Sequence, residues 1–154
     1  MPKHFEYSIL LSSKPEEVFR LITDRRYSGN SKVLRDVEWR GGAPWQLGST
    51  RVAETLVPFH SVHAQRVLTR RENTLLELIS HGFGYTMYLE IVLRPSGLGE
   101  GTEVDYLIDI EGTLPLLFGF VIEEFVSRFM EAYLAELLQA SHDPALFLSS
   151  REAA

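Results

Sequence analysis

Hydrophobic residues recur at helical spacing between Leu114 and Ser141, in the last quarter of the chain. The positions that share one side of a helical projection are Leu114, Phe118, Val121, Ile122, Phe125, Phe129 and Tyr133. This wide apolar stripe predicts one long amphipathic helix, which at ~1.5 Å per residue would span roughly 40 Å. A stripe of that width needs a large apolar surface to pack against.

A membrane-spanning helix is the alternative interpretation of the same segment. Glu123, Glu124, Arg128 and Glu131 interrupt the hydrophobic run. Because a charge at the centre of a bilayer costs ~2.5–3.5 kcal/mol on insertion scales, the pattern favours a buried helix over a membrane span.

The chain before this helix alternates between apolar and polar residues with the period of β-strands. Strand one covers Phe5–Leu11, and the other predicted strands are Leu34–Arg40, Thr50–Val57, Ser61–Arg70, Thr74–His81, Tyr85–Arg94 and Glu103–Glu111. Glycine, proline and asparagine separate them, and such short connections imply antiparallel pairing. The strands supply the surface that the long helix requires.

Two short helices are expected between strand one and the next strand. Ser13 is placed to cap the first helix, with Pro15 in its first turn and an end near Asp24. Tyr27–Leu34 forms a second short helix or an irregular turn. Residues 1–142 thus make one predicted domain, and 143–154 form a tail, expected to be flexible, in which Leu146, Phe147 and Leu148 could dock.

Composition narrows the functional classes. The 154 residues carry a net charge of −6, which argues against a nucleic-acid partner. The absence of cysteine excludes disulfides, thiolate metal sites and a cysteine nucleophile. The first residues contain no signal-peptide pattern, so we expect a cytoplasmic protein.

Four motifs in a fixed order resemble a known superfamily. They are the segments Ser13 to Phe19, Trp45 to Arg51, Gly101 to Val104 and Glu111 to Leu116. Their order and spacing resemble the START-like superfamily, also called SRPBCC, and most closely its polyketide cyclase/dehydrase branch. The resemblance implies an α+β helix-grip fold: a seven-stranded antiparallel sheet curled around a long C-terminal helix, with two short helices after strand one. It also implies a cavity for a hydrophobic small molecule, without specifying a reaction.

The more apolar face of each strand is taken as the inner wall of this cavity, although a slip of one residue would reverse each assignment. The predicted ligand-binding residues are Tyr7, Arg66, Leu78, Tyr85, Met87, Tyr106, Ile108, Phe125, Phe129 and Tyr133. Glu54 and Arg66 are charges on otherwise apolar faces, which makes them candidate catalytic residues. Arg66 would bind a carboxylate or polarise a carbonyl, and Glu54 would move a proton. A structural salt bridge, a solvated rim or a shifted register remain alternatives.

Several further side chains receive assignments from the pattern. The five histidines are scattered, so we expect surface positions, no metal site and no cofactor, with His60 and His63 on opposite faces of a strand. Glu136 is expected in solvent near the helix end, with the cavity mouth as an alternative. Trp45 and Phe59 are candidate rim residues or ordinary packing residues.

Three functions are compatible with these features. The first is binding of a lipid-, polyketide- or isoprenoid-like molecule. The second is an enzyme resembling aromatase/cyclases, which close and dehydrate a poly-β-keto chain. The third is a protein-interaction or quinone-chaperone role, suggested by Phe120, Leu134 and Leu138 on the outward side of the helix, which could also support a homodimer.

Overall fold

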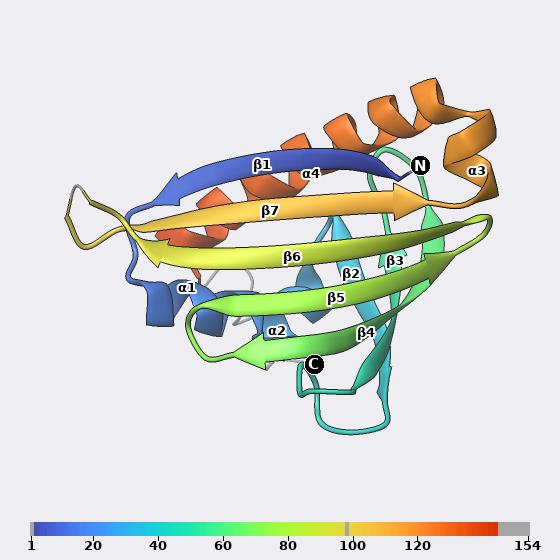
Figure 1. Cartoon of the computed structure of the whole chain (residues 1–154). Helices are drawn as coiled ribbons and strands as arrows, with labels where there is room; N and C mark the ends of the chain where they lie inside the picture. Colours follow the sequence, from blue (N-terminus) through green and yellow to red (C-terminus); the bar gives the residue numbers. More distant parts are fainter. Residues whose placement is uncertain (1, 98, 145–154) are drawn as a thin grey trace.

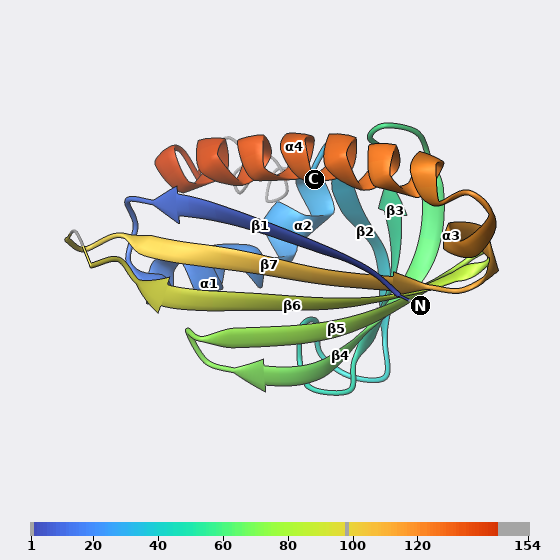
Figure 2. The same ribbon diagram turned by 45° about the horizontal axis from the view of Figure 1, so that its top comes forward.

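The computed structural model describes residues 2–97 and 99–144 of the chain. Within them the elements are β1 (Lys3–Leu11), α1 (Pro15–Ile22), α2 (Arg25–Asn30), β2 (Leu34–Arg40), β3 (Thr50–Thr55), β4 (Ser61–Arg71), β5 (Leu75–Gly82), β6 (Tyr85–Pro95), β7 (Thr102–Glu111), α3 (Thr113–Leu117) and α4 (Gly119–His142). The sheet curls, α4 lies along its concave side, and α1 and α2 cover one end (Figure 1). Figure 2 shows from a second direction how α4 runs along the sheet.

All seven strands form one antiparallel sheet in the order β1-β7-β6-β5-β4-β3-β2. Strands β2 to β7 are a meander, because each strand pairs with the next one in sequence. The first strand, β1, lies at one edge of the sheet and pairs with the last strand, β7, in a register that sets Tyr7 opposite Tyr106. The predicted fold class is confirmed, including the long C-terminal helix and the short helices after strand one.

The core lies between α4 and the concave face of the sheet. Val126, Met130 and Leu137 on α4 are buried, and so are Leu76 and Tyr106 on the facing strands. Alternation along β7 is complete, since every second residue from Thr102 to Ile110 is buried. Burial of these apolar side chains is the main favourable term in folding.

The long helix differs from its prediction at its beginning. Residue Phe118 leaves helical geometry, with φ −129° and ψ 42°, and separates α3 from α4. Gly119 follows the break, and the Lys3 side chain occupies the space that a Cβ at Gly119 would need. Glycine has a low helix propensity, so a break here costs little. The sequence period does not reveal the break because Leu114 and Phe118, which are four residues apart, both still line the cavity.

The first short helix has the predicted Pro15 in its first turn and ends near Asp24, but its cap differs from the prediction, as do the bounds of the second helix. Lys14, not Ser13, is the N-cap of α1, and the Ser13 carbonyl instead accepts a hydrogen bond from Thr102 Oγ1 at 2.6 Å. Asp24 caps α2 by accepting from the Arg26 backbone N–H at 2.7 Å. The second helix therefore starts before Tyr27, and the chain is extended again by Leu34.

No helix in residues 2–97 and 99–144 is long and apolar enough to cross a bilayer. Residues 145–154, which include Leu146, Phe147 and Leu148 of the predicted tail, lie outside the described residues.

Candidate ligand cavity

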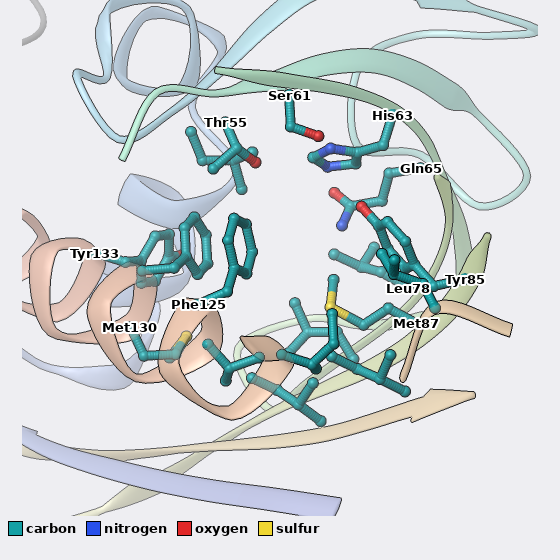
Figure 3. Close-up of a pocket in the computed structure, with 18 of the residues that line it drawn as sticks. Thr55, Ser61, His63, Gln65, Leu78, Tyr85, Met87, Phe125, Met130 and Tyr133 are labelled. Atoms are coloured by element: carbon teal, nitrogen blue, oxygen red, sulfur yellow. The ribbon is translucent and has the colours of Figure 1, made fainter. Parts of the chain in front are cut away.

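A cavity of about 610 Å³ separates α4 from the concave face of the sheet. Its surface is mostly apolar, with side chains contributed by β3 to β7 and by α3 and α4. Figure 3 shows two contrasting walls: Phe125 and Tyr133 lie on one side, and Ser61, His63 and Gln65 lie on the opposite side. The cavity is therefore aromatic toward the helix and polar toward β4.

The aromatic wall is built by residues four apart on α4. The rings of Phe125 and Phe129 are parallel within 2° at a centroid distance of 6.3 Å, and those of Phe129 and Tyr133 lie 5.8 Å apart. Helical spacing makes such residues neighbours on one face. Phe59, from the loop before β4, contacts Phe125 at a centroid distance of 5.1 Å. Together the four rings offer an extended surface for a flat molecule.

The polar wall crosses three neighbouring strands in register. Arg51 on β3 lies opposite Gln65 on β4, and Gln65 lies opposite Ser80 on β5. Arg51 Nε donates to Gln65 Oε1 at 2.7 Å, and Gln65 Nε2 donates to Ser80 Oγ at 2.9 Å. All three side chains are buried, so these hydrogen bonds satisfy groups that water does not reach.

Asp36 neutralises the charge of this wall. Its Oδ1 accepts from Arg51 Nη1 at 2.7 Å, and its Oδ2 accepts from Trp39 Nε1 at 2.8 Å and from Ser28 Oγ at 2.5 Å. Arg51 also lies over the Trp45 ring, 4.4 Å from its centroid, in a cation–π contact. The buried cation thus has a carboxylate, an amide and an aromatic ring of the protein as partners.

His63 is the exception on the polar wall. It lines the cavity and is 7% exposed, yet neither ring nitrogen has a hydrogen-bond partner within the described residues. Burial, together with the nearby Arg51 charge, lowers the pKa of His63 from 6.5 to about 4. The imidazole is therefore neutral near pH 7, with one nitrogen as donor and the other as acceptor.

Tyrosine hydroxyls complete the polar part of the lining. Tyr106 donates to the Tyr133 hydroxyl at 3.3 Å, and burial raises the pKa of both side chains. Burial also raises the pKa of Tyr85, while a hydrogen bond with Ser61 opposes the rise. These phenols stay uncharged at physiological pH, so they add no negative charge to the cavity.

Exposed apolar side chains surround the outer end of the cavity. Phe59, Phe83, Phe118 and Val121 line it, and each is more than half exposed. Phe83 occupies the β5–β6 turn, and Phe118 marks the break between α3 and α4. This arrangement surrounds the mouth with apolar surface contributed by three separate segments.

The predicted ligand-binding residues fall into two groups. Those that line the cavity are Leu78, Tyr85, Met87, Tyr106, Ile108, Phe125, Phe129 and Tyr133. Tyr7 does not line it; it is partly buried on β1 and packs against the core. Arg66 lies exposed on the opposite face of β4, so its predicted position in the cavity is wrong.

Glu54 also lies on the outer face, so its predicted position on the inner wall of the cavity is wrong as well. Glu54 accepts hydrogen bonds from Arg35 and contacts His60 Nε2 at 2.7 Å; these two partners, Arg35 first, lower its pKa. In the pairing of β3 with β4, Glu54 lies opposite Val62, not Arg66. The error is a slip of one residue on both strands: Arg51 and Thr55 face inward on β3, as His63 and Gln65 do on β4.

Three other assignments from the sequence change in the structure, and a fourth, the open choice for Trp45, is decided. Glu136 is 8% exposed, not solvated, and binds Ser31 Oγ and the Lys32 backbone N–H. His63 is buried, not at the surface. Leu134 packs against the core, whereas Phe120 and Leu138 are exposed as predicted. Trp45 lines the cavity but is 3% exposed, so it is a packing residue and not part of the rim.

The inner polar residues were missed because apolarity was used to choose the face. On β4 the outer face carries Val62 and Leu68, both exposed, while the inner face carries His63 and Gln65. The β4–β5 hairpin gave no signal either, because its register next to the turn, Thr69 opposite Glu77, would set Arg66 opposite Ser80 if it continued unchanged. A β-bulge between Val67 and Thr69 shifts the register and brings Gln65 opposite Ser80 instead. Among residues 2–97 and 99–144, no cluster of three histidine, aspartate or glutamate side chains could hold a metal ion.

Several solved structures resemble this chain. Zhui aromatase/cyclase from Streptomyces sp. R1128 matches with a TM-score of 0.69 and 13% identity, over 92% of this chain and 94% of that chain. The protein TTHA0849 from Thermus thermophilus matches with a TM-score of 0.67 and 17% identity, over 93% of this chain and 99% of that chain. Norcoclaurine synthase from Thalictrum flavum matches with a TM-score of 0.66 and 8% identity, over 90% of this chain and 86% of that chain.

The sequence by itself matches no protein-family model and, at a significant level, no curated protein. At these low identities the structural matches establish the fold and leave the activity open. The chain has the expected helix-grip fold and shares it with these solved structures.

Proposed function

We propose that this protein binds a hydrophobic, aromatic small molecule in the cavity between α4 and the sheet. The observation that carries the proposal is the cavity of about 610 Å³ with its wall of stacked rings on α4. Binding sites for small molecules are usually concave, mostly apolar and roughly 300–1,000 Å³ in volume, with a few polar groups that orient the ligand. The dimensions and the lining both fit this description.

The solved structures support the same class of ligand by analogy. The norcoclaurine synthase structure was determined with dopamine and hydroxybenzaldehyde, both of which contain one aromatic ring with polar substituents. A cavity with an aromatic wall facing a polar wall suits molecules of that kind. The analogy extends only to the shape of the ligand.

Binding is favoured over aromatase/cyclase chemistry by the polar groups of the lining. Glu54 and Arg66, the candidate catalytic residues from the sequence, lie on the outer face. His63 lines the cavity, but a base with a pKa of about 4 is poorly matched to proton abstraction near pH 7. Arg51 is held by Asp36 and Gln65. The lining therefore offers hydrogen bonds for orientation more readily than a general base.

The test uses N-phenyl-1-naphthylamine, an uncharged probe that becomes fluorescent in apolar sites. We expect the wild-type protein to bind one probe molecule with a micromolar Kd. Met87 lines the cavity, so Met87→Trp should fill part of it and weaken binding by about tenfold or more, a change of ~1.4 kcal/mol or more.

Tyr88→Trp is the matched control, because Tyr88 adjoins Met87 on β6 and points to the outer face, where it is 41% exposed. This variant should keep the wild-type affinity. Absence of probe binding by the wild type, or equal binding by Met87→Trp and Tyr88→Trp, would contradict the proposal.

A further inference from the structure

The buried polar atoms that lack a partner gather at this cavity. Within the described residues they are Trp45 Nε1 and the two ring nitrogens of His63, and both residues line the cavity. Buried polar groups are nearly always hydrogen-bonded, so each exception needs an explanation. Both exceptions also adjoin Arg51, whose guanidinium lies over the Trp45 ring and whose charge acts on His63.

Resting on the binding function proposed above, we propose that His63 is the recognition residue of the cavity and selects an uncharged aromatic ligand that carries a hydroxyl group. The hydroxyl donates to the unprotonated ring nitrogen of His63, and an adjacent oxygen of the ligand can accept from the ring N–H. The inference adds the chemical class of the ligand and the residue that reads it.

The arrangement of the cavity walls fits a flat ligand that has one polar edge. Figure 3 shows His63 on the wall opposite Phe125 and Tyr133, with Ser61 and Tyr85 on its own side. A ring system stacked on the α4 aromatics therefore presents one edge to β4. Apolar contact on one side and a hydrogen bond on the other would fix both the position and the orientation of the ligand.

The charges around the cavity favour a neutral ligand. Among the described residues that line the cavity, Arg51 is the one with a charged side chain, and Asp36 already pairs with it at 2.7 Å. A ligand carboxylate would have to compete with Asp36, and a ligand cation would lie near Arg51 without a free carboxylate. A neutral hydroxyl avoids both penalties, because His63 can satisfy it without any change of charge.

The experiment compares 2-naphthol with 2-methylnaphthalene, which replaces the hydroxyl by a methyl group of similar size. Each compound displaces N-phenyl-1-naphthylamine from the wild-type protein. We expect 2-naphthol to bind about tenfold more tightly, the ratio produced by ~1.4 kcal/mol. His63→Leu should abolish this preference and leave the affinity for 2-methylnaphthalene within about twofold of the wild type.

His81→Leu is the matched control. His81 lies on β5 opposite Ala64 and is exposed, so its removal should leave the preference for 2-naphthol intact. A second measurement needs no variant: the ¹⁵N resonances of the His63 ring should shift when 2-naphthol is added and stay in place with 2-methylnaphthalene.

The outcomes separate the two proposals. If the wild type fails to bind N-phenyl-1-naphthylamine, the proposed function fails, and this inference with it. If the probe binds but 2-naphthol and 2-methylnaphthalene compete equally, the role of His63 is overturned while the binding function stands. Unchanged His63 resonances in the presence of bound 2-naphthol overturn it as well, even where His63→Leu does not fold.

Discussion

Arg51 on β3 and Asp36 on β2 form a buried ion pair, with Arg51 Nη1 2.7 Å from Asp36 Oδ1 and side chains that are 4% and 7% exposed. The pair is the centre of a wider network, because Asp36 also accepts from Trp39 and Ser28 while Arg51 donates to Gln65. It joins the edge of the sheet to α2 and to the polar wall of the cavity. A buried pair of this kind contributes modestly as a whole, but loss of one partner leaves an isolated buried charge.

Asp36→Ala should therefore lower the free energy of unfolding by about 3–5 kcal/mol. The variant leaves the Arg51 charge buried without its counter-ion and removes the acceptor of Trp39 Nε1. Urea unfolding at neutral pH, followed by circular dichroism, measures the loss.

Glu124→Ala is the control for this prediction. Glu124 and Arg128 form an ion pair at 2.8 Å on the exposed side of α4, where both side chains are more than half exposed. Exposed pairs of this spacing contribute about 0.3–0.5 kcal/mol. Equal losses in Asp36→Ala and Glu124→Ala would show that the buried network does not stabilise the fold.

The buried state of His63 predicts that stability depends on pH. The pKa of His63 is about 4 in the folded protein, whereas its ordinary value, expected in the unfolded chain, is 6.5. The imidazole therefore binds a proton more readily in the unfolded chain than in the folded protein. Above pH 6.5 the side chain is neutral in both states, and the folded protein has its full stability. As the pH falls toward 4 the unfolded chain takes up the proton first, so the free energy of unfolding decreases. Between about pH 7.5 and about pH 4.5 this loss amounts to about 2–3 kcal/mol.

Unfolding curves of the wild type and of His63→Leu, measured at both pH values, isolate this contribution. Other acidic groups titrate equally in both proteins, so only the difference between their pH dependences is compared. The variant should lose about 2–3 kcal/mol less than the wild type. Parallel pH dependences would show that His63 is not buried in neutral form.

The architecture could be predicted from the sequence because it depends on the periodicity of apolar residues and on the turns between the elements. The alternation on β5, β6 and β7 is strong, since inward residues such as Leu76, Leu78 and Ile91 are apolar and fully buried. The helical stripe on α4 is equally regular, so the residues assigned to the inner face of the helix do line the cavity. Apart from the buried polar residues Ser80, Thr102 and Glu136, apolarity and burial coincide on these elements.

The polar side of the site could not be predicted in the same way. On β3 and β4 the inner residues Arg51, His63 and Gln65 are polar, and apolarity therefore selects the wrong face. Burial of Arg51 is possible only because Asp36 and Gln65 supply partners, and those partners are distant in the sequence. Such compensation is a property of the tertiary arrangement, which local patterns do not contain.

Glu136 connects α4 to the α2–β2 segment. Its Oε1 accepts from the Ser31 hydroxyl and from Tyr27 at 3.4 Å, and its Oε2 accepts from the Lys32 backbone N–H at 2.8 Å. Glu136→Ala should lower the free energy of unfolding by about 2–4 kcal/mol, because it removes the carboxylate that accepts from the buried Ser31 hydroxyl and from the Lys32 backbone N–H. Hydrogen exchange should increase at the Lys32 amide in particular.

Glu131→Ala is the appropriate comparison, since Glu131 lies on the same helix and is exposed. Its replacement should change stability by less than about 0.5 kcal/mol. If Glu136→Ala behaves like Glu131→Ala, the buried carboxylate does not hold the α2–β2 segment in place.

Gly82 controls the position of Tyr85 in the cavity wall. The Tyr85 ring lies directly over Gly82 at the β5–β6 turn, in the space that a Cβ would occupy. Gly82→Ala must therefore displace the ring, and overpacking of this kind costs about 1–3 kcal/mol. Because Tyr85 lines the cavity and contacts Ser61, the displaced ring should also weaken binding of N-phenyl-1-naphthylamine. Gly97→Ala should change neither property, since no atom lies within 4 Å of a Cβ there. Unchanged probe affinity in Gly82→Ala would show that Tyr85 does not shape the binding site.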